Sequence, residues 1–415
     1  MIAPFFVLQI FCFGTLNHAK HVLALALGTL ALGIAEFSMM SILLPTAEDL
    51  SVTVPEAGHF ISAYAAGVLL MVTIARRIPL KRLLLIIAGL ICLGNTLTIF
   101  APSYSLMIVS RFIAGLPHGA FFGVGSIVCA KLAGPGKASH DVSMMVAGMT
   151  IANLGGVPLA SFLAWALSWR AAFVIAALLA LLALLAIRLW VPQTEPLPDR
   201  GFKAQFRFLG TLEPWLVLGA IGLGNGGFFA YYSYVNPVIE HVAEIPASMM
   251  SLVITLAGAG MVLGNLFCAK ISSRFSDPSL AAAGQGCLFI TLVALFFMAH
   301  WAPAAVLLTA LAAACVFFIS GPEQVMMIEN AGEGQLLAAA LAQCSFNAGN
   351  AVGAWLGGLP IEAGKAANWA AMPGIFLALA GFGLLFAKWQ IHLIRQRERM
   401  EDRVEALQEA LRDKE

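Results

Sequence analysis

Two ionisable side chains lie alone inside long apolar stretches. Glu36 is the only charged residue in LALGTLALGIAEFSMM (25–40), and Arg111 is the only basic residue well inside such a stretch. A charged side chain in a membrane helix costs at least about 2.5 to 3.5 kcal/mol, so it normally faces a cavity or a partner. A carboxyl group near a guanidinium can bind and release a proton when its surroundings change. Glu36 and Arg111 are therefore candidates for a proton-coupling pair; the alternative is a structural ion pair.

The composition places these residues in a membrane. The chain of 415 residues is 60% hydrophobic and 11% charged, with a mean hydropathy of +0.89. A soluble domain cannot expose so much apolar surface. Because a helix of about 20 residues crosses the hydrocarbon core, we predict an all-α membrane protein with twelve transmembrane helices. The predicted ranges are 22–44, 56–76, 82–100, 104–127, 141–165, 171–191, 213–238, 246–269, 280–299, 303–328, 335–360 and 367–389.

The twelve segments form two similar sets of six. LALGTLALGIAEF (25–37) and LVLGAIGLGNGGF (216–228) share the pattern L-x-L-G-x(3)-L-G-x(3)-F. Duplicated halves are typical of carriers that bind a solute between the repeats. Glu36 aligns with Gly227, so a packing need common to both halves does not explain the acid. The predicted organisation is an N-terminal extension (1–19), a six-helix bundle (20–191), a cytoplasmic linker (192–212), a second six-helix bundle (213–389) and a charged cytoplasmic tail helix (390–415).

The distribution of Lys and Arg predicts the orientation. With the N-terminus inside, the cytoplasmic loops hold most of these residues, whereas the outer loops hold only Arg170 and Lys365. Positive charge is retained on the cytoplasmic side, so we expect both termini there. Glu36 then lies roughly 12 Å and Arg111 roughly 10 Å below the outer ends of their helices, at 1.5 Å per residue. We therefore expect the two side chains to interact, directly or through water.

Further polar residues in the predicted spans are candidates for lining a substrate cavity. These are His118, Tyr231, Tyr234, Asn236, Asn347 and Asn350. Each could equally bond a neighbouring helix, as polar groups in membrane bundles often do. Glu323 lies about five residues from the predicted inner end of its span, where we expect it to reach cytoplasmic water; the alternative is a role in coupling.

The fourth and fifth spans carry the most specific motifs. RFIAGLPHGAFFGVGSIV (111–128) resembles the fourth-span motif of the arabinose efflux permease branch of the twelve-span drug:proton antiporters, within the major facilitator superfamily. Arg111, Gly115 and Gly119 match its Arg-x(3)-Gly core. AGMTIANLGGVPLASFL (147–163) resembles the antiporter motif of the fifth span, with Gly148, Asn153, Gly156 and Pro158 as its packing residues. The resemblance implies the twelve-helix carrier fold, proton-driven export of sugars or drugs, and a place for Arg111 in the coupling site.

One loop departs from this family pattern. Between spans two and three the superfamily usually has G-x-L-A-D-R-x-G-R-R, whereas this chain reads MVTIARRIPLKR (71–82) and lacks the aspartate and second glycine. The resemblance covers about Lys20 to Lys388. The apolar run at 1–19 lies outside it and lacks the basic region of a signal peptide; an over-extended start of the chain is the favoured explanation.

Other classes of function fit less well. No G-x(4)-G-K-[ST] motif for ATP binding is present, and the seven cysteines show no metal-ligand spacing. We predict a carrier, not an enzyme, that needs no cofactor or metal and does not bind nucleic acid. Its expected partners are a small neutral or hydrophobic solute, protons and the lipid bilayer of a bacterial inner membrane, with the protein a monomer. The alternative is a facilitator that moves its solute downhill without protons.

Overall fold

The fold consists of long helices joined by short connections. The computed structural model describes residues 16–70, 78–133, 138–194, 206–272, 274–329, 331 and 334–412. The first half contains α2 (Leu16–Ser41), α3 (Leu43–Asp49), α4 (Val54–Leu70), α5 (Leu80–Ile99), α6 (Tyr104–Gly115), α7 (Pro117–Leu132), α8 (Ala138–Ile151), α9 (Val157–Ala166) and α10 (Arg170–Trp190). The second half contains α12 (Leu212–Tyr232), α13 (Val235–Pro237), α14 (Met250–Ile271), α15 (Asp277–Met298), α16 (Ala302–Glu329), α17 (Gln335–Glu362) and α18 (Ala371–Arg412).

These helices confirm the predicted twelve-span fold. Among the described residues, nine helical segments are long and apolar enough to cross a membrane. The other three spans are α4, α12 and α17. The α12 and α17 sequences contain several glycine and asparagine residues, and these two helices pack closely against each other. The α17 helix also packs against α4 of the first half. These three helices therefore form a continuous series of contacts, from α12 through α17 to α4, that joins the second half to the first.

Two spans of the first half are interrupted close to a proline. The fourth span divides at Leu116 into α6 and α7, with Pro117 at the start of α7. The fifth span contains one π-helical turn, η2 (Ala152–Gly156), immediately before α9 and Pro158. Proline lacks a backbone N–H, so a helix tolerates it best at such a restart. π-helical turns often occur at functional positions, and this one holds Asn153 of the antiporter motif.

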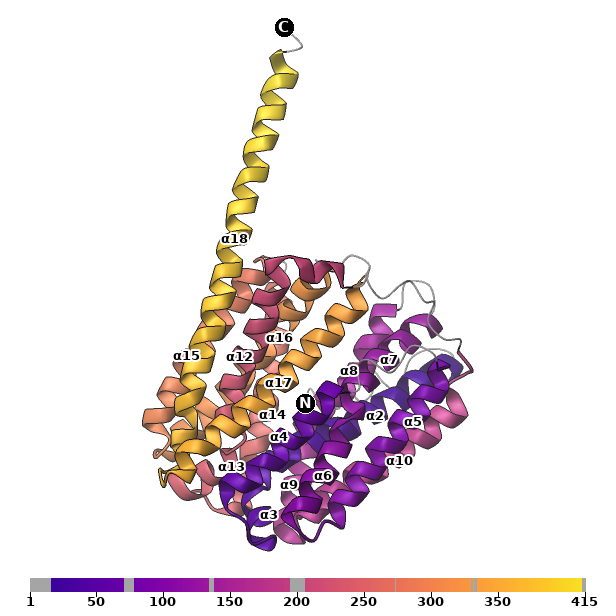
Figure 1. Cartoon of the computed structure of the whole chain (residues 1–415), viewed down its shortest axis with the longest axis vertical. Helices are drawn as coiled ribbons and strands as arrows, with labels where there is room; N and C mark the ends of the chain where they lie inside the picture. Colours follow the sequence, from indigo (N-terminus) through magenta and orange to yellow (C-terminus); the bar gives the residue numbers. More distant parts are fainter. Residues whose placement is uncertain are drawn as a thin grey trace.

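The two halves meet at one end of the bundle. Their ribbons approach each other around α3 and α13 and diverge toward the end from which α18 projects (Figure 1). We call these the α3 end and the tail end. At the α3 end, Leu44 N donates to Asn236 Oδ1 at 2.8 Å, and Ser251 Oγ donates to the Pro158 carbonyl at 2.9 Å. Both bonds join one half to the other, so the model represents a state closed at the α3 end.

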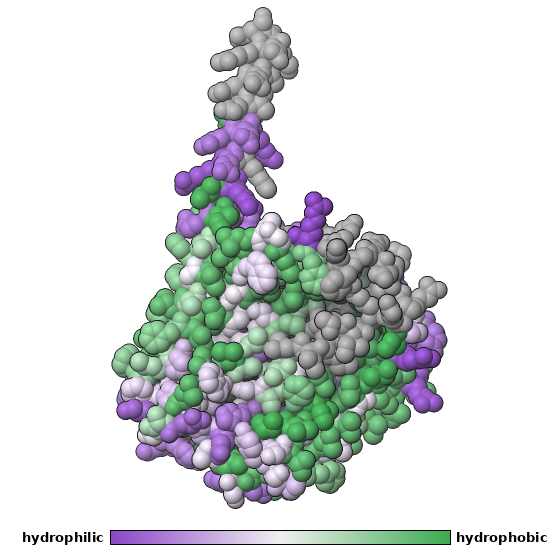
Figure 2. Space-filling view, in the orientation of Figure 1, coloured by the Kyte–Doolittle hydropathy of each residue, from purple (hydrophilic) through white to green (hydrophobic). Residues whose placement is uncertain are grey.

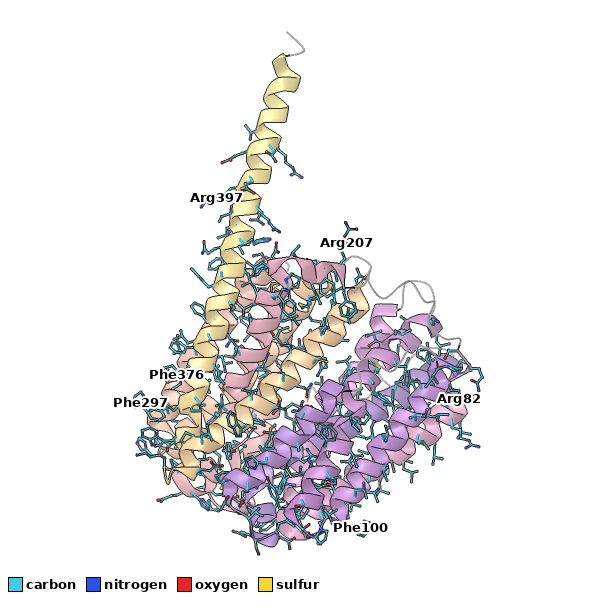
Figure 3. All side chains as sticks on the ribbon, in the orientation of Figure 1. Arg82, Phe100, Arg207, Phe297, Phe376 and Arg397 are labelled. Atoms are coloured by element: carbon cyan, nitrogen blue, oxygen red, sulfur yellow. The ribbon has the colours of Figure 1, made fainter. Side chains whose placement is uncertain are left out.

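The outer surface of the bundle is apolar. Hydrophobic residues cover most of the coloured bundle surface in Figure 2, whereas hydrophilic residues gather on the projecting part of α18 and around the α3 end. Phe100, Phe297 and Phe376 are 75%, 67% and 62% exposed, and Figure 3 shows them pointing away from the bundle. Such side chains would be unfavourable in water and are suited to lipid.

The last helix contains both most of the twelfth predicted span and most of the predicted tail helix. α18 runs without a break for 42 residues to Arg412. At 1.5 Å per residue it is about 63 Å long, twice the hydrocarbon thickness, so part of it must lie outside the bilayer. Lys388 and Arg395 of α18 form ion pairs with Glu213 of α12, which fix the helix where it leaves the bundle.

Several predictions fall on residues that the structure does not describe. Most of the extension 1–19, most of the linker 192–212 and most of the altered loop 71–82 are among them. The predictions for these three segments therefore lie outside the described residues.

Candidate functional site

Glu36 lies at the junction of the two halves. It belongs to α2 and is 2% exposed. Asn350 of α17, in the second half, donates from Nδ2 to Glu36 Oε1 at 3.3 Å. His118 of α7 places Nε2 3.8 Å from Glu36 Oε2, which is beyond hydrogen-bond distance but close enough for electrostatic interaction. The carboxylate thus contacts both halves.

Arg111 belongs to the same buried group but does not touch Glu36 directly. Its side chain is fully buried, and its guanidinium carbon lies 4.5 Å from the centre of the Tyr64 ring and 5.2 Å from that of Phe173. The Tyr64 hydroxyl is hydrogen bonded to His118 Nδ1 at 2.9 Å. Tyr64 and His118 therefore connect Arg111 to Glu36. We call these four residues with Asn350 the central array.

The Arg111 guanidinium has unused hydrogen-bonding capacity. Nε donates to the Phe60 carbonyl at 3.4 Å, while Nη1 and Nη2 have no hydrogen-bond partner within the described part of the chain. A buried, always charged group with free donors is costly unless the surroundings supply negative charge. Glu36 is the acidic member of the central array. The arrangement leaves Arg111 able to bond a carboxylate or a polar solute after a small movement.

The glycines of the two motifs permit close helix contact. A Cβ at Gly115 would lie 1.9 Å from the Tyr64 carbonyl oxygen, so only glycine lets α6 approach α4 this closely and hold Arg111 over the Tyr64 ring. A Cβ at Gly148 would lie 2.2 Å from the Ala26 carbonyl oxygen of α2. Gly119 is buried in α7, and a Cβ at Gly156 would meet the Ile34 side chain at 2.7 Å. These contacts give a packing reason for the motif positions.

The remaining candidates for lining a substrate cavity differ in their hydrogen-bond partners. Tyr231 bonds Thr309 of α16 at 2.6 Å, and Tyr234 donates to the Ala354 carbonyl of α17 at 2.9 Å. Asn236 joins α13 to Leu44, as described above, and its amide also donates to Glu240. Asn347 donates to the Gln343 carbonyl within α17 at 2.9 Å. Four of the six candidates thus bond backbone or neighbouring helices, whereas His118 and Asn350 contact Glu36.

A second buried carboxyl group lies in the second half. Glu323 of α16 is 3% exposed, so the expectation that it reaches water is wrong. The helix continues to Glu329, and the buried Met326 and Met327 lie between Glu323 and its end. Asn225 of α12 donates from Nδ2 to Glu323 Oε2 at 3.5 Å, and Oε1 has no hydrogen-bond partner in the described chain.

Sequence reasoning missed Tyr64 and the pairing of Asn225 with Glu323. Tyr64 is one of five tyrosines and lies in an ordinary apolar segment, so no pattern marks it. Asn225 is visible as an amide in a glycine-rich span, but its partner is 98 residues away. In the described residues no three His, Cys, Asp or Glu side chains gather closely enough to hold a metal ion.

Two half-bundles with buried polar groups at their junction are the architecture of a membrane carrier. The comparisons with known proteins identify the family of carriers. The model of the Major Facilitator Superfamily matches residues 25–336, and the chain belongs to that superfamily. It is a membrane transporter, not an enzyme.

One relative above 30% identity supports this assignment, two further relatives are less similar, and one solved structure shares the fold. AraJ of Escherichia coli (strain K12) is 37% identical over 377 residues, covering 89% of this chain and 96% of that protein. A chloramphenicol resistance protein of Streptomyces lividans is 26% identical, covering 79% and 86%, and the purine ribonucleoside efflux pump NepI of Shigella sonnei is 28% identical, covering 63% and 67%. The crystal structure of a bacterial homolog of the human lysosomal transporter Spinster, in an inward-facing and unoccupied conformation, matches with a TM-score of 0.67 at 15% identity, covering 94% and 99%.

Proposed function

We propose that the protein exports small neutral or hydrophobic molecules in exchange for protons, with Glu36 as the proton-coupling residue. The observation that carries the proposal is the position of Glu36, buried between the halves and bonded to Asn350 across their junction. A carrier works by moving one half against the other around a central site. A carboxyl group at that junction can couple its protonation to the movement.

The coupling follows from the strength of one hydrogen bond. An ionised Glu36 accepts a charge-assisted bond from Asn350, which is stronger than a bond between neutral groups. Binding a proton weakens this bond and loosens α2 from α17. Arg111 sets the balance between the ionised and the protonated form of Glu36, because positive charge nearby favours the ionised form. Protonation from one side and release to the other then accompany the two orientations of the carrier.

The direction of transport and the class of solute follow from the charge distribution, the relatives and the central array. The excess of Lys and Arg in the loops near the tail end supports a cytoplasmic location for that end and for both termini. The bacterial relatives include an efflux pump and a drug resistance protein, which favours export across an inner membrane. Glu36 is the acidic member of the central array, so a neutral solute would face least competition from fixed charge. Sugars, nucleosides and lipophilic drugs all meet this description.

The test measures proton movement in inside-out vesicles that hold a pH gradient. Arabinose, other sugars, nucleosides, chloramphenicol and dye cations are added in turn to vesicles with the unaltered protein or with Glu36→Gln. We expect at least one compound to collapse the gradient with the unaltered protein only. The matched control is Glu48→Gln, which removes an exposed carboxylate on α3 and should pump normally.

The alternative function is proton-independent facilitated transport. In that case labelled solute equilibrates across the vesicle membrane, yet no compound changes the gradient, and Glu36 serves only to join the halves. An unimpaired Glu36→Gln pump would contradict the proposed role of Glu36 even if the protein proves to be an exporter.

A further inference from the structure

The second buried carboxyl group, Glu323, has none of the charged support that Glu36 has. Its only described polar contact is the long bond from Asn225 at 3.5 Å. Burial of an ion without a counter-charge costs several kcal/mol, and binding a proton removes most of that cost. A neutral carboxyl group also gains an O–H donor while its other oxygen still accepts from Asn225.

Within the part of the chain that the structure describes, no cationic side chain forms an ion pair with Glu323. The helices packed against α16 are α12, α14, α15 and α17, with contacts also from η4 (Val238–Val242). Their titratable groups are Glu213, Tyr231 and Tyr232 on α12, Cys268 and Lys270 on α14, Asp277 and Cys287 on α15, Cys344 and Glu362 on α17, and Glu240 and His241 on η4. Among these described residues none forms a hydrogen bond or an ion pair with Glu323.

The repeat relates this position to the central array. FIAGLPH (112–118) in the fourth span and FISGPE (318–323) in the tenth align with one gap, which places Pro322 and Glu323 opposite Pro117 and His118. On the first helix of each half, Asn225 aligns with Ile34, two residues before the pair Gly227 and Glu36. Each half therefore has an acid near a neutral polar side chain between its first and fourth helices. The acid is on the first helix in one half and on the fourth in the other.

A cavity lies near Glu323 at the tail end. A cavity of about 490 Å³ at that end is lined by Met326 and Glu329 of α16, together with Asp277, Lys388 and His392. Met326 is three residues from Glu323, or roughly 4.5 Å along the helix axis. A carboxyl group one turn from a water-accessible cavity can exchange a proton with solution through a small opening of the helix packing. Pro322 favours such an opening, since it leaves one carbonyl of the preceding turn without its helical partner.

We propose that Glu323 is a second proton-binding site, which exchanges with the tail-end cavity and carries a second proton in the transport cycle. This deepens the proposed function and depends on it for the role in transport, but not for the binding of the proton. The exporter would then move two protons in each cycle, one through each half.

The first experiment detects the bound proton without any substrate. Dicyclohexylcarbodiimide reacts with protonated carboxyl groups in apolar surroundings, and peptide mass spectrometry locates the adduct. The full-length protein in proteoliposomes is labelled between about pH 5 and pH 9. We expect Glu323 to be labelled at neutral pH, with labelling falling about tenfold per pH unit above its midpoint. Glu362→Gln, which alters an exposed carboxylate at the end of α17 outside the cavity, should leave the profile unchanged, and the ion-paired Glu213 should stay unlabelled.

Infrared spectroscopy provides a check that needs no chemical access. The C=O stretch of a protonated carboxyl group should be present at neutral pH, should disappear at high pH, and should be missing from Glu323→Gln. Glutamine has nearly the same shape and can still bond Asn225, so this variant should fold. A Glu323 signal absent at every pH, or unchanged at every pH, would overturn the proposal, because the group would then be permanently charged or permanently neutral.

The role in transport is tested with whichever compound the vesicle assay identifies as a substrate. With two coupled protons the limiting accumulation ratio of the solute rises a hundredfold for each pH unit of gradient, whereas with one proton it rises only tenfold. Glu323→Gln should therefore lower the ratio about tenfold for each pH unit of gradient. Unchanged accumulation would overturn the transport role. If no compound is pumped, the proposed function fails, and the labelling and infrared results still decide whether Glu323 binds an exchangeable proton.

Discussion

The two halves of the molecule treat a buried carboxyl group differently. In the first half, Glu36 shares a central array with Arg111, His118 and Tyr64, and it receives a bond from Asn350 of the other half. In the second half, Glu323 has one long contact with Asn225 of its own half. Glu36 is thus bonded to the opposite half, whereas the described contact of Glu323 stays within its own half, so only the first site changes directly when the halves move.

Removal of Arg111 should make the first site resemble the second. In Arg111→Gln we expect Glu36 to become reactive with dicyclohexylcarbodiimide at neutral pH, by about tenfold or more, because the nearest fixed positive charge is gone. Gradient-driven transport should be lost. The measurements are peptide labelling and the vesicle assay.

Arg111→Lys is the matched control for this change. It keeps a positive charge but loses the planar group over the Tyr64 ring, so it should retain the low reactivity of Glu36. Equal labelling of Glu36 in the unaltered protein, Arg111→Lys and Arg111→Gln would show that the charge of Arg111 does not keep Glu36 ionised. The two buried carboxyl groups would then not differ in their charged support.

Much of this contrast could be predicted from the sequence. Glu36 and Arg111 are conspicuous because each is a lone charge in an apolar stretch, and the twelve spans follow from length and hydropathy. The intermediate residue Tyr64 could not be predicted, because a tyrosine in an apolar helix has no periodicity or spacing that reveals its partner. The burial of Glu323 was also missed, since distance from a predicted helix end does not tell which side chains cover a residue.

The closed α3 end depends on a glycine in the second half. A Cβ at Gly258 of α14 would lie 2.1 Å from the Asn153 carbonyl oxygen in η2 of the first half. Gly258→Ala should therefore force the halves apart there, at a cost of about 1 to 3 kcal/mol typical of overpacking. We expect the population of the state described here to fall about tenfold or more.

Distances between spin labels at positions Lys131 and Gln335, one in each half near the tail end, measure that population. The matched control is Gly155→Ala in η2, where an added Cβ meets no atom within 4 Å. If both variants give the same distance distribution as the unaltered protein, the close contact at Gly258 does not limit the closure of the α3 end.

The bond between Asn350 and Glu36 should have a smaller and pH-dependent effect. Asn350→Leu keeps a similar volume and removes the donor, which costs about 1.5 kcal/mol for a charged acceptor. We expect a population shift of roughly tenfold, measured with the same spin labels. The effect should be smaller in the Glu36→Gln background, because a bond from Asn350 to a neutral amide oxygen is weaker than a charge-assisted one. A full effect there would mean that Asn350 acts through another contact.

Helix packing explains why the partners of the other candidates could not be predicted. Tyr234, Asn236 and Asn350 are all amide or hydroxyl groups within predicted spans, and nothing in the sequence shows which partner each one bonds. The structure separates them, because Tyr234 and Asn236 bond backbone groups at the α3 end and Asn350 alone reaches Glu36. Specificity of this kind arises from the rotation of each helix about its axis, which hydropathy does not encode.

The smallest effect should come from the exposed ion pair of the first half. Arg170 Nη1 of α10 lies 2.6 Å from Asp49 Oδ2 of α3, and the Trp169 indole donates to the same oxygen at 3.1 Å. The hydrogen bond from Arg170 lowers the pKa of Asp49 below its ordinary value of 3.8. The ionised form is thus favoured in the folded state, so the stabilisation is present above about pH 4 and is lost as the pH falls further.

Both side chains of that pair are partly exposed, at 32% and 44%, so solvent screens the interaction. Asp49→Asn should lower the free energy of unfolding by only about 0.2 to 1 kcal/mol at neutral pH, and by less near pH 3. Thermal unfolding of the detergent-solubilised protein at the two pH values measures this, with Arg170→Gln and the double variant completing the cycle. The pair of the second half, Glu213 with Lys388, is 12% and 6% exposed, and its loss should be more costly. A larger loss of unfolding free energy at Asp49 than at Glu213 would reverse this comparison, because the exposed pair at the α3 end would then be the more stabilising one.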